Sequence, residues 1–359
     1  METSGLFCRI PFISREFPLV GDTVTTTVPS KFYRRNLGMG YKVITLKHMD
    51  DSGVQYMAEH GVEIITSQAG DEAGWIQEIA ANQVDGIFCR VDKITPAMMD
   101  ASPNLKVIAK QGAGLDNIDL DYATKKGIQV VYSPAGNMET VAEHAAMLLL
   151  MCAQRYRYVD HQMRGGNFNV RYTLTGTHDL NGHTIGLIGC GRISQCFANI
   201  LVNGFGMKAI GYDPFLKPEN LRVPVELKAT AEEVWQQADY VSIHLQSNPS
   251  TRHSIGYQQF SMMKPTASFI NCARGDLIVE EDLIRALKEG KLAGAGLDVF
   301  QQEPLPMDHP FLTMENIVLT PHMGAATEDS VIRCTLTCCE EIVQVFNGQP
   351  VAFPGNKLV

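Results

Sequence analysis

The fold is decided by the run from His183 to Leu201, HTIGLIGCGRISQCFANIL. A short apolar run ends at Gly189-Cys190-Gly191 and is followed directly by a helical pattern. Glycines at such a turn let the backbone bend tightly and let its amides approach a pyrophosphate at the start of the helix. Ser194 stands where a third glycine is usual, and serine is still small enough for close helix–strand packing. The stretch therefore predicts the first turn of a dinucleotide-binding fold.

The next strand-like run, KAIGYD, ends at Asp213, at about the distance from the glycine turn where a ribose-binding acid is expected. A carboxylate there accepts hydrogen bonds from a free 2′-hydroxyl and repels a 2′-phosphate, which favours NAD over NADP. The alternative is a glycine turn followed by an unrelated surface aspartate.

Strand-like runs alternate with helical patterns on both sides of this stretch. YKVITL, VEIIT, GIFCR, LKVIAKQ and IQVVYS come before it, and KAIGYD, YVSIHL, ASFINCA, GAGLDVF and NIVLT come after it. Such alternation predicts βαβ units and parallel sheets. A chain of 359 residues is long for one core, so we expect an α/β fold with two Rossmann-like domains.

Composition narrows the class of protein. Apolar residues make up 45% of the chain and charged residues 19%, as in a globular protein, and the net charge of −9 argues against nucleic acid as a partner. The longest apolar stretch, Val141 to Ala153, contains Glu143 and His144 and is too short to span a bilayer. The nine cysteines lack the paired spacing of a metal site, so we expect free thiols in the cytoplasm and no bound metal.

Residues 1–39 differ from the rest of the chain. They carry four arginines and one lysine, a TTTVPS run and no clear period. We expect a poorly ordered N-terminal extension; a targeting segment or an upstream start codon are the alternatives.

Polar residues follow the ends of successive strand-like runs in the second half of the chain. Arg274 closes SFINCARG, Glu303 follows GAGLDVF in the run QQEP, and His322 closes IVLTPH. Each has an ordinary structural explanation, as a surface cation, a turn residue or a hydrogen-bonded ring. The carboxyl ends of parallel strands form the ligand site of an open sheet, however, so these side chains are predicted to converge.

These motifs together resemble those of the D-isomer-specific 2-hydroxyacid dehydrogenase family. The similar runs in the second half are GCGRIS, YDP, SIHLQSNPST, NCARGDLIVEEDLIRALKEGKLAGAGLDVFQQEP and LTPHMG. The first half contributes NLKVIAKQGAGLDNIDL and SPAGNMETVAEHAAMLLL. The resemblance covers nearly everything from Tyr41 to about Gly348, although Gln246 stands where the family often has proline.

The resemblance implies a role for each catalytic residue. Arg274 would hold the substrate's carboxylate and polarise the adjacent carbonyl, since its planar fork binds carboxylate bidentately. His322 would donate a proton to the carbonyl oxygen as hydride arrives, and remove it in the reverse direction. Glu303 would bind the other ring nitrogen and fix its tautomer.

The resemblance also implies the ligand contacts. The Gly112-Ala113-Gly114 loop would bind the substrate's carboxylate through backbone amides, unless it is an ordinary turn. Arg90 would add an anion clamp for phosphorylated acids, although its spacing to Thr95 is one residue short and a solvated arginine is the alternative. The implied cofactor contacts are Gly189, Gly191, Arg192, Ile193, Asp213, Leu245, Cys272, Ala273, Asp298 and Gly324, with Asp298 at the nicotinamide carboxamide.

The expected organisation has a substrate domain made of residues 40–137 and 322–359 and an NAD-binding domain made of residues 138–321, with the active-site cleft between them. One helix from Glu139 to about Arg164 would connect them; its apolar face is large for one subunit to bury, and the resemblance implies that this helix helps to form a homodimer. The chain ends soon after a helix from Glu328 to Phe346, so no appended regulatory domain is expected.

We therefore expect an NAD-dependent D-2-hydroxyacid dehydrogenase acting on a small 2-keto acid. A 3-phosphoglycerate dehydrogenase-like enzyme is favoured by HLQSNPST and Arg90. The loop PLPMDHPFL favours a glyoxylate or hydroxypyruvate reductase, and a D-lactate-type enzyme is a further alternative. A dinucleotide-sensing co-regulator on the same fold is the alternative from another class.

Overall fold

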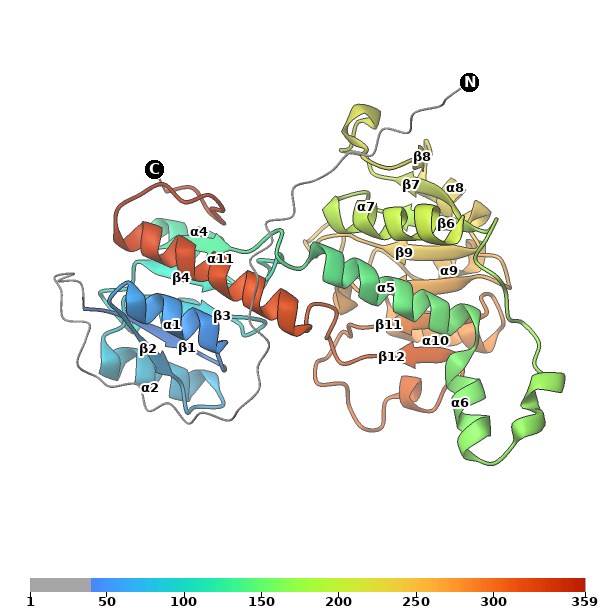
Figure 1. Cartoon of the computed structure of the whole chain (residues 1–359), viewed down its shortest axis with the longest axis horizontal. Helices are drawn as coiled ribbons and strands as arrows, with labels where there is room; N and C mark the ends of the chain where they lie inside the picture. Colours follow the sequence, from blue (N-terminus) through green and yellow to red (C-terminus); the bar gives the residue numbers. More distant parts are fainter. Residues whose placement is uncertain (1–39, 359) are drawn as a thin grey trace, which may run out of the picture. The chain divides into compact units, whose positions relative to one another are not determined.

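The computed structural model describes residues 40–358 and contains two parallel β-sheets with helices on both faces (Figure 1). Every paired strand in both sheets runs parallel to its neighbour, which confirms the predicted α/β class. The expected N-terminal extension lies outside the described residues.

The first sheet has five strands in the order β2-β1-β3-β4-β5. Its strands are short and almost fully buried in the middle, as parallel strands covered on both faces must be. They are β1 (Tyr41–Thr45), β2 (Val62–Thr66), β3 (Gly86–Cys89), β4 (Val107–Lys110) and β5 (Gln129–Tyr132).

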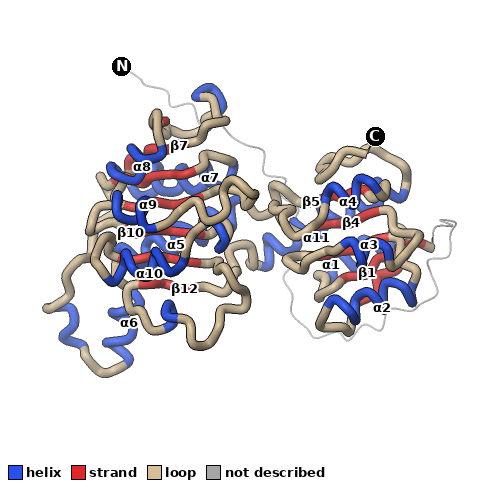
Figure 2. The backbone as a smooth tube through the Cα atoms, turned by 180° about the vertical axis from the view of Figure 1, so that it is seen from behind, coloured by secondary structure: helices blue, strands red, loops and turns tan. Residues whose placement is uncertain are grey.

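Alternation along β1 explains why helices pack on both faces of this sheet. Val43 packs in a cluster with residues of α1 (Asp51–Glu59) and α11 (Glu328–Phe346). Its neighbour Ile44 points to the opposite face and packs with residues of α2 (Glu72–Asn82), α3 (Pro96–Asp100) and α4 (Leu120–Lys125). Figures 1 and 2 show these two helical layers from opposite sides. The last helix of the chain thus belongs to the core of the first sheet.

The second sheet has seven strands in the order β12-β11-β10-β9-β6-β7-β8. The chain proceeds from β6 to β8 in one direction and from β9 to β12 in the other, so the order reverses between β6 and β9. Ligands bind in α/β sheets at the carboxyl ends of strands at such a reversal. The strands are β6 (Thr184–Ile188), β7 (Lys208–Tyr212), β8 (Glu226–Leu227), β9 (Tyr240–Ile243), β10 (Ser268–Asn271), β11 (Gly294–Leu297) and β12 (Ile317–Leu319).

Two apolar clusters hold helices against this sheet. One cluster joins it to α5 (Met138–Ala153) and α7 (Arg192–Asn199), in front of the strands in Figure 1. The other joins it to α8 (Ala231–Gln237), α9 (Tyr257–Met262) and α10 (Glu280–Lys288), in front in Figure 2. The short helical turns are η1 (Phe168–Tyr172), η2 (Ile200–Gly204), η3 (Pro218–Asn220), η4 (Gly275–Leu277) and η5 (Pro310–Leu312).

The expectation of one helix from Glu139 to about Arg164 is wrong. The structure has α5, which ends at Ala153, and a separate helix α6 (Tyr156–Arg164). Arg155 lies between them with a φ of 49°, a left-handed conformation that a continuous α-helix does not contain. The apolar side of α5 is mostly buried against its own chain, whereas α6 has no buried residue.

Among the described residues, no helix has the length and apolar character needed to cross a membrane. Over the same range of the chain, 40–358, no group of histidine, cysteine and acidic residues has an arrangement that could hold a metal ion.

Candidate active site

The three strands β10, β11 and β12 bring three of the predicted site residues to one edge of the second sheet. Asn271 pairs in register with Leu297, and Leu297 pairs in register with Leu319. The segments that follow these residues therefore leave the sheet side by side. They carry Arg274, Asp298 and His322.

Glu303 and His322 form a direct pair in this structure. The Oε2 atom of Glu303 lies 2.7 Å from Nδ1 of His322, and its Oε1 accepts a hydrogen bond of 3.0 Å from the amide of Phe300. Burial works to raise the pKa of Glu303, but the hydrogen bond and charge of His322 and the Phe300 amide together lower it. The carboxylate therefore stays ionised and orients the ring, which leaves Nε2 to meet a ligand.

The backbone of His322 is strained and is held by Asp298. His322 has a φ of 50°, which is unusual for a residue with a side chain. Its amide donates to the carbonyl of Asp298 at 2.7 Å. The Asp298 carboxylate accepts from the amides of Met323 (2.9 Å) and Gly324 (2.8 Å) and from the hydroxyl of Thr320 (2.7 Å). These bonds fix the turn that presents the imidazole.

Asp298 is only 1% exposed, and α5 supplies a further partner for it. The Nε2 atom of His144 lies 3.3 Å from Asp298 Oδ1 and 2.9 Å from the Thr320 hydroxyl. Burial works to raise the pKa of Asp298, but its hydrogen bonds outweigh burial and lower that pKa. Sequence reasoning missed His144, which carries no motif of its own on an apolar helix.

Arg274 is bound by Asp116, a residue from the loop after β4 that sequence reasoning also missed. Its Nε donates to both carboxylate oxygens of Asp116 at 3.1 Å, and its Nη2 donates to Oδ1 at 3.0 Å. Nη1 donates to the carbonyl of Ala273 at 2.7 Å. The donors left over are at the Nη1–Nη2 end of the guanidinium, which suits a bidentate carboxylate.

The Gly112–Gly114 loop lies directly against this guanidinium. A Cβ atom on Gly114 would be 1.8 Å from Arg274 Nη2, so a side chain there would displace the guanidinium from this position. Gly112 has a φ of 123°, in the region that glycine alone adopts readily. The predicted substrate loop and the predicted substrate arginine are therefore in contact. Arg90 is half-buried at the end of β3, and its side chain makes no hydrogen bond or ion pair with another residue in the range 40–358.

The glycine turn after β6 fits a dinucleotide. Gly189 has a φ of 88°, and a Cβ there would be 2.8 Å from the carbonyl oxygen of His244, which follows β9. A Cβ on Gly191 would meet no atom within 4 Å, so the space over this turn is open. Gly191 precedes α7, whose first turn has no side-chain cap, so its amides remain available to an anion.

Asp213 lies beside the same turn. Its carboxylate accepts from the amide of Cys190 at 2.9 Å and from the amide of Phe215 at 2.9 Å. A carboxylate held in this way can still accept from a ribose hydroxyl.

The other predicted cofactor residues lie at or near the glycine turn after β6 or the turn that carries His322. Leu245 Cδ2 would be 3.2 Å from a Cβ on Gly189, and Gly324 is bound to Asp298 through its amide. Arg192 is exposed and Ile193 is half-buried at the start of α7, and Ser194 is completely buried, as close packing requires. Burial, assisted by Asp298, raises the pKa of the Cys272 thiol well above its ordinary value, so that thiol stays protonated.

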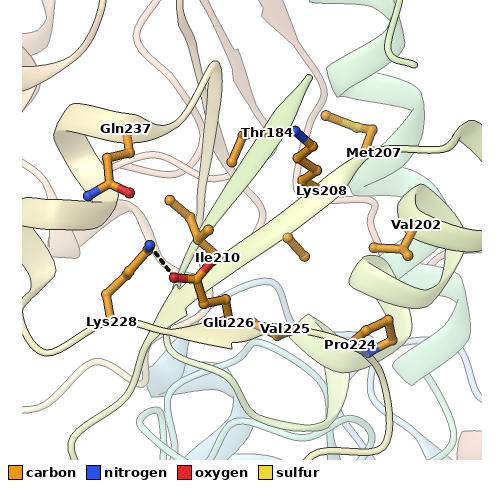
Figure 3. A pocket seen from close by; sticks show the side chains of 11 residues that line it. Thr184, Val202, Met207, Lys208, Ile210, Pro224, Val225, Glu226, Lys228 and Gln237 are labelled. Carbon is orange, nitrogen blue, oxygen red and sulfur yellow. Dashed lines mark hydrogen bonds and ion pairs between the residues drawn. The ribbon is translucent and has the colours of Figure 1, made fainter. Parts of the chain in front are cut away.

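A surface hollow of about 640 Å³ lies elsewhere on the second sheet (Figure 3). Thr184 and Lys208, the first residues of β6 and β7, line it together with Gln237 at the end of α8. It is therefore at the amino ends of the strands, opposite the end that carries Gly189 and Asp213. Its lining includes none of the predicted site residues.

Comparison with known proteins shows the family of the chain. The family described as "D-isomer specific 2-hydroxyacid dehydrogenase, NAD binding domain" matches residues 146–324. The chain is 35% identical over 325 residues to a glyoxylate reductase from Thermofilum pendens, covering 89% of this chain and 95% of that protein. The chain belongs to the D-isomer specific 2-hydroxyacid dehydrogenases, a family of oxidoreductases.

Two further members of this family extend the comparison. A D-3-phosphoglycerate dehydrogenase from Methanocaldococcus jannaschii is 37% identical over 311 residues, which is 86% of this chain and 58% of that protein. The chain thus spans little more than half the length of that relative. The crystal structure of an NAD+-bound 3-phosphoglycerate dehydrogenase from Entamoeba histolytica is 25% identical, with a TM-score of 0.75 over 89% of this chain and all of that one. These matches place a nicotinamide dinucleotide site in the chain's family.

Proposed function

We propose that this protein catalyses the reversible reduction of a 2-keto acid to a D-2-hydroxy acid. The observation that carries the proposal is the hydrogen-bonded pair of the Glu303 carboxylate and the His322 ring, at the carboxyl edge of the sheet that also bears the dinucleotide turn. A nicotinamide dinucleotide bound at Gly189 and Gly191 would supply or accept the hydride. The protein's own residues then have to bind the acid, orient its carbonyl and move one proton.

The contacts of each side chain indicate its role in the reaction. Asp116 and Ala273 accept one N–H each from Nη2 and Nη1 of Arg274, and Asp116 also accepts from Nε. The remaining N–H groups, on the Nη1–Nη2 side of the guanidinium, would face the substrate. His322 gives a proton from Nε2 to the carbonyl oxygen during reduction and takes it back in the reverse reaction. Glu303 stabilises the protonated ring through Nδ1, in the way that a carboxylate orients a catalytic histidine.

We infer that NAD is preferred over NADP. The Asp213 carboxylate is placed by the amides of Cys190 and Phe215 beside the glycine turn. A ribose 2′-hydroxyl can donate to this carboxylate, whereas a 2′-phosphate would be repelled by its charge.

The favoured substrate pair is 3-phosphoglycerate and its 2-keto acid. Arg90 supports this choice, because its side chain is unpaired among residues 40–358 and Cys89 pairs in register with Lys110 beside the substrate loop. Glyoxylate or hydroxypyruvate is the second candidate, because a glyoxylate reductase aligns along nearly its whole length with this chain. A dinucleotide-sensing co-regulator would bind the cofactor in the same way and turn over none of these acids.

We further propose the domain roles and the assembly. The first sheet with α11 would form the substrate domain, from residues 40–137 and 322–359, and residues 138–321 would form the NAD-binding domain. The exposed aromatic residues of α6 and η1 support a homodimer, as developed below. The eight cysteines that the structure describes are free thiols, which supports a cytoplasmic location.

An NADH-oxidation screen tests the proposal. Purified protein is assayed with NADH and with NADPH against pyruvate, glyoxylate, hydroxypyruvate, phosphohydroxypyruvate and bulky aromatic 2-keto acids. We expect turnover with NADH, loss of most turnover in Arg274→Ala and His322→Asn, and nearly unchanged NADH binding in both variants. NADH binding by the wild-type protein with no turnover across this panel would favour the sensor, and full activity of His322→Asn would remove the proton donor from the mechanism.

A further inference from the structure

Lys110 is a buried cation beside the proposed substrate loop. It is the last residue of β4, and it is only 6% exposed. Its Nζ makes no hydrogen bond or ion pair with any other residue that the structure describes. A Cβ built on Gly112 would be 2.6 Å from this Nζ, just as a Cβ on Gly114 would touch Arg274. The two cations therefore flank the same loop, one at each glycine.

The charges around this loop are not balanced. Asp116 neutralises Arg274 through the bidentate pair described above, and no carboxylate among residues 40–358 does the same for Lys110. The titratable groups that face Lys110 are Arg274, Asp116, Cys89 of β3 and Cys338 of α11. Burial lowers the pKa of Lys110, and Arg274 lowers it further against the smaller opposite effects of the thiols and Asp116.

An ammonium that is largely removed from water and has no partner is costly, and an anion that binds it lowers that cost. We propose that Lys110 is the counter-ion of the substrate's carboxylate, and that it binds this group at the Gly112 end of the loop. This inference rests on the proposed function only in that it concerns the same substrate site. The carboxylate of a 2-keto acid supplies the one negative charge that the loop lacks.

The inference separates the roles of the two cations. Lys110 would provide the attraction that draws the acid into the site, so its loss should appear in KM. Arg274, already neutralised, would orient the carboxylate and the carbonyl, so its loss should appear mainly in kcat. The site should also discriminate a carboxylate from an uncharged amide of the same shape through Lys110.

The direct test is binding of a non-reacting pair of probes to the NADH complex. Oxamate carries a carboxylate, and oxamide is its uncharged counterpart. Isothermal titration calorimetry on the wild-type protein should show binding of oxamate over oxamide. Lys110→Met should weaken oxamate binding about 10- to 100-fold, the effect of losing one charge-assisted hydrogen bond, and should leave oxamide unchanged.

Control variants keep the test specific. Lys110→Arg should retain oxamate binding within a few-fold, and Lys125→Met, which removes an exposed lysine on α4, should behave as wild type. Raising the pH neutralises Lys110, so oxamate affinity should fall toward alkaline pH in the wild type and persist to higher pH in Lys110→Arg. With the best 2-keto acid of the screen, Lys110→Met should raise KM about 10-fold or more and change kcat less than about threefold.

The outcomes separate this inference from the proposed function. Unchanged oxamate affinity and unchanged KM in Lys110→Met overturn the inference and leave the dehydrogenase standing. The same is true if only substrates with a second anionic group are affected, because Lys110 would then hold that group instead. Oxamate binding that depends on Lys110, in a protein that turns over no 2-keto acid, would support the inference and overturn the proposed function.

Discussion

The Glu303–His322 pair makes the stability of this protein depend on pH. The folded-state pKa of Glu303 is below its ordinary value of 4.5, so the pair contributes stability above that pH and loses it as the pH falls through the folded-state pKa. Glu303→Gln should therefore be less stable than the wild type at pH 7, by roughly 1 kcal/mol for a charge-assisted bond partly exposed to solvent. Urea unfolding at pH 7, 5 and 4 measures the gap, which should narrow below pH 4.5; a constant gap would show that Glu303 acts without its charge.

Asp116 acts on the reaction through Arg274. Asp116→Asn should keep the shape of the loop and lose the ionic anchor of the guanidinium, so we expect kcat for 2-keto acid reduction to fall about tenfold or more. The site simultaneously gains positive charge, so KM for the acid should stay the same or fall. Asp121→Asn, at an exposed position on α4, is the matched control. A rise in KM with unchanged kcat in Asp116→Asn would contradict an orienting role.

At the scale of the element, the turn between β6 and α7 has two glycines with different tasks. Gly189→Ala places a methyl 2.8 Å from the His244 carbonyl at a φ of 88°, and should cost roughly 1–3 kcal/mol of stability. Gly191→Ala meets no atom, so it should fold normally and weaken NADH binding about tenfold by filling the space over the helix start. Thermal unfolding and NADH fluorescence titration distinguish the two; normal NADH affinity in Gly191→Ala would place the pyrophosphate elsewhere.

The same turn illustrates what the sequence could predict. Parallel strands with local helical crossovers leave a repeating apolar signature, and each strand end marks the edge at which a ligand is bound. The positions of Gly189, Asp213 and His322 follow from that local pattern, because each is tied to a strand next to it in the chain.

Contacts made across the fold leave no such signature. Asp116 meets Arg274 across 158 positions of sequence, and His144 on helix α5 reaches Asp298, which follows strand β11. Lys110 reads as an ordinary strand terminus until its neighbours are placed. The break at Arg155 was also missed, because a single left-handed residue does not interrupt the helical spacing of apolar side chains on either side of it.

At the scale of the whole molecule, α6 and η1 carry several exposed aromatic side chains. Phe168 is 58% exposed and Tyr172 is 73% exposed, and α6 has no buried residue, while Figure 1 shows both elements projecting from the second sheet. Aromatic side chains of this kind dominate the energetics of protein interfaces. In the proposed homodimer, a second copy of the chain would cover these aromatic side chains.

Phe168→Glu tests that assembly. A charge at the centre of an apolar interface leaves an unpaired buried carboxylate, so the dimer dissociation constant should rise at least about tenfold. Sedimentation equilibrium at micromolar concentration should show a dimer for the wild type and a shift toward monomer for Phe168→Glu. Met307→Glu, at a residue that is 91% exposed on another loop, should remain dimeric. If the wild-type protein is a monomer at that concentration, the proposed homodimer is wrong. If the protein is a dimer that Phe168→Glu does not weaken, the interface does not include α6 and η1.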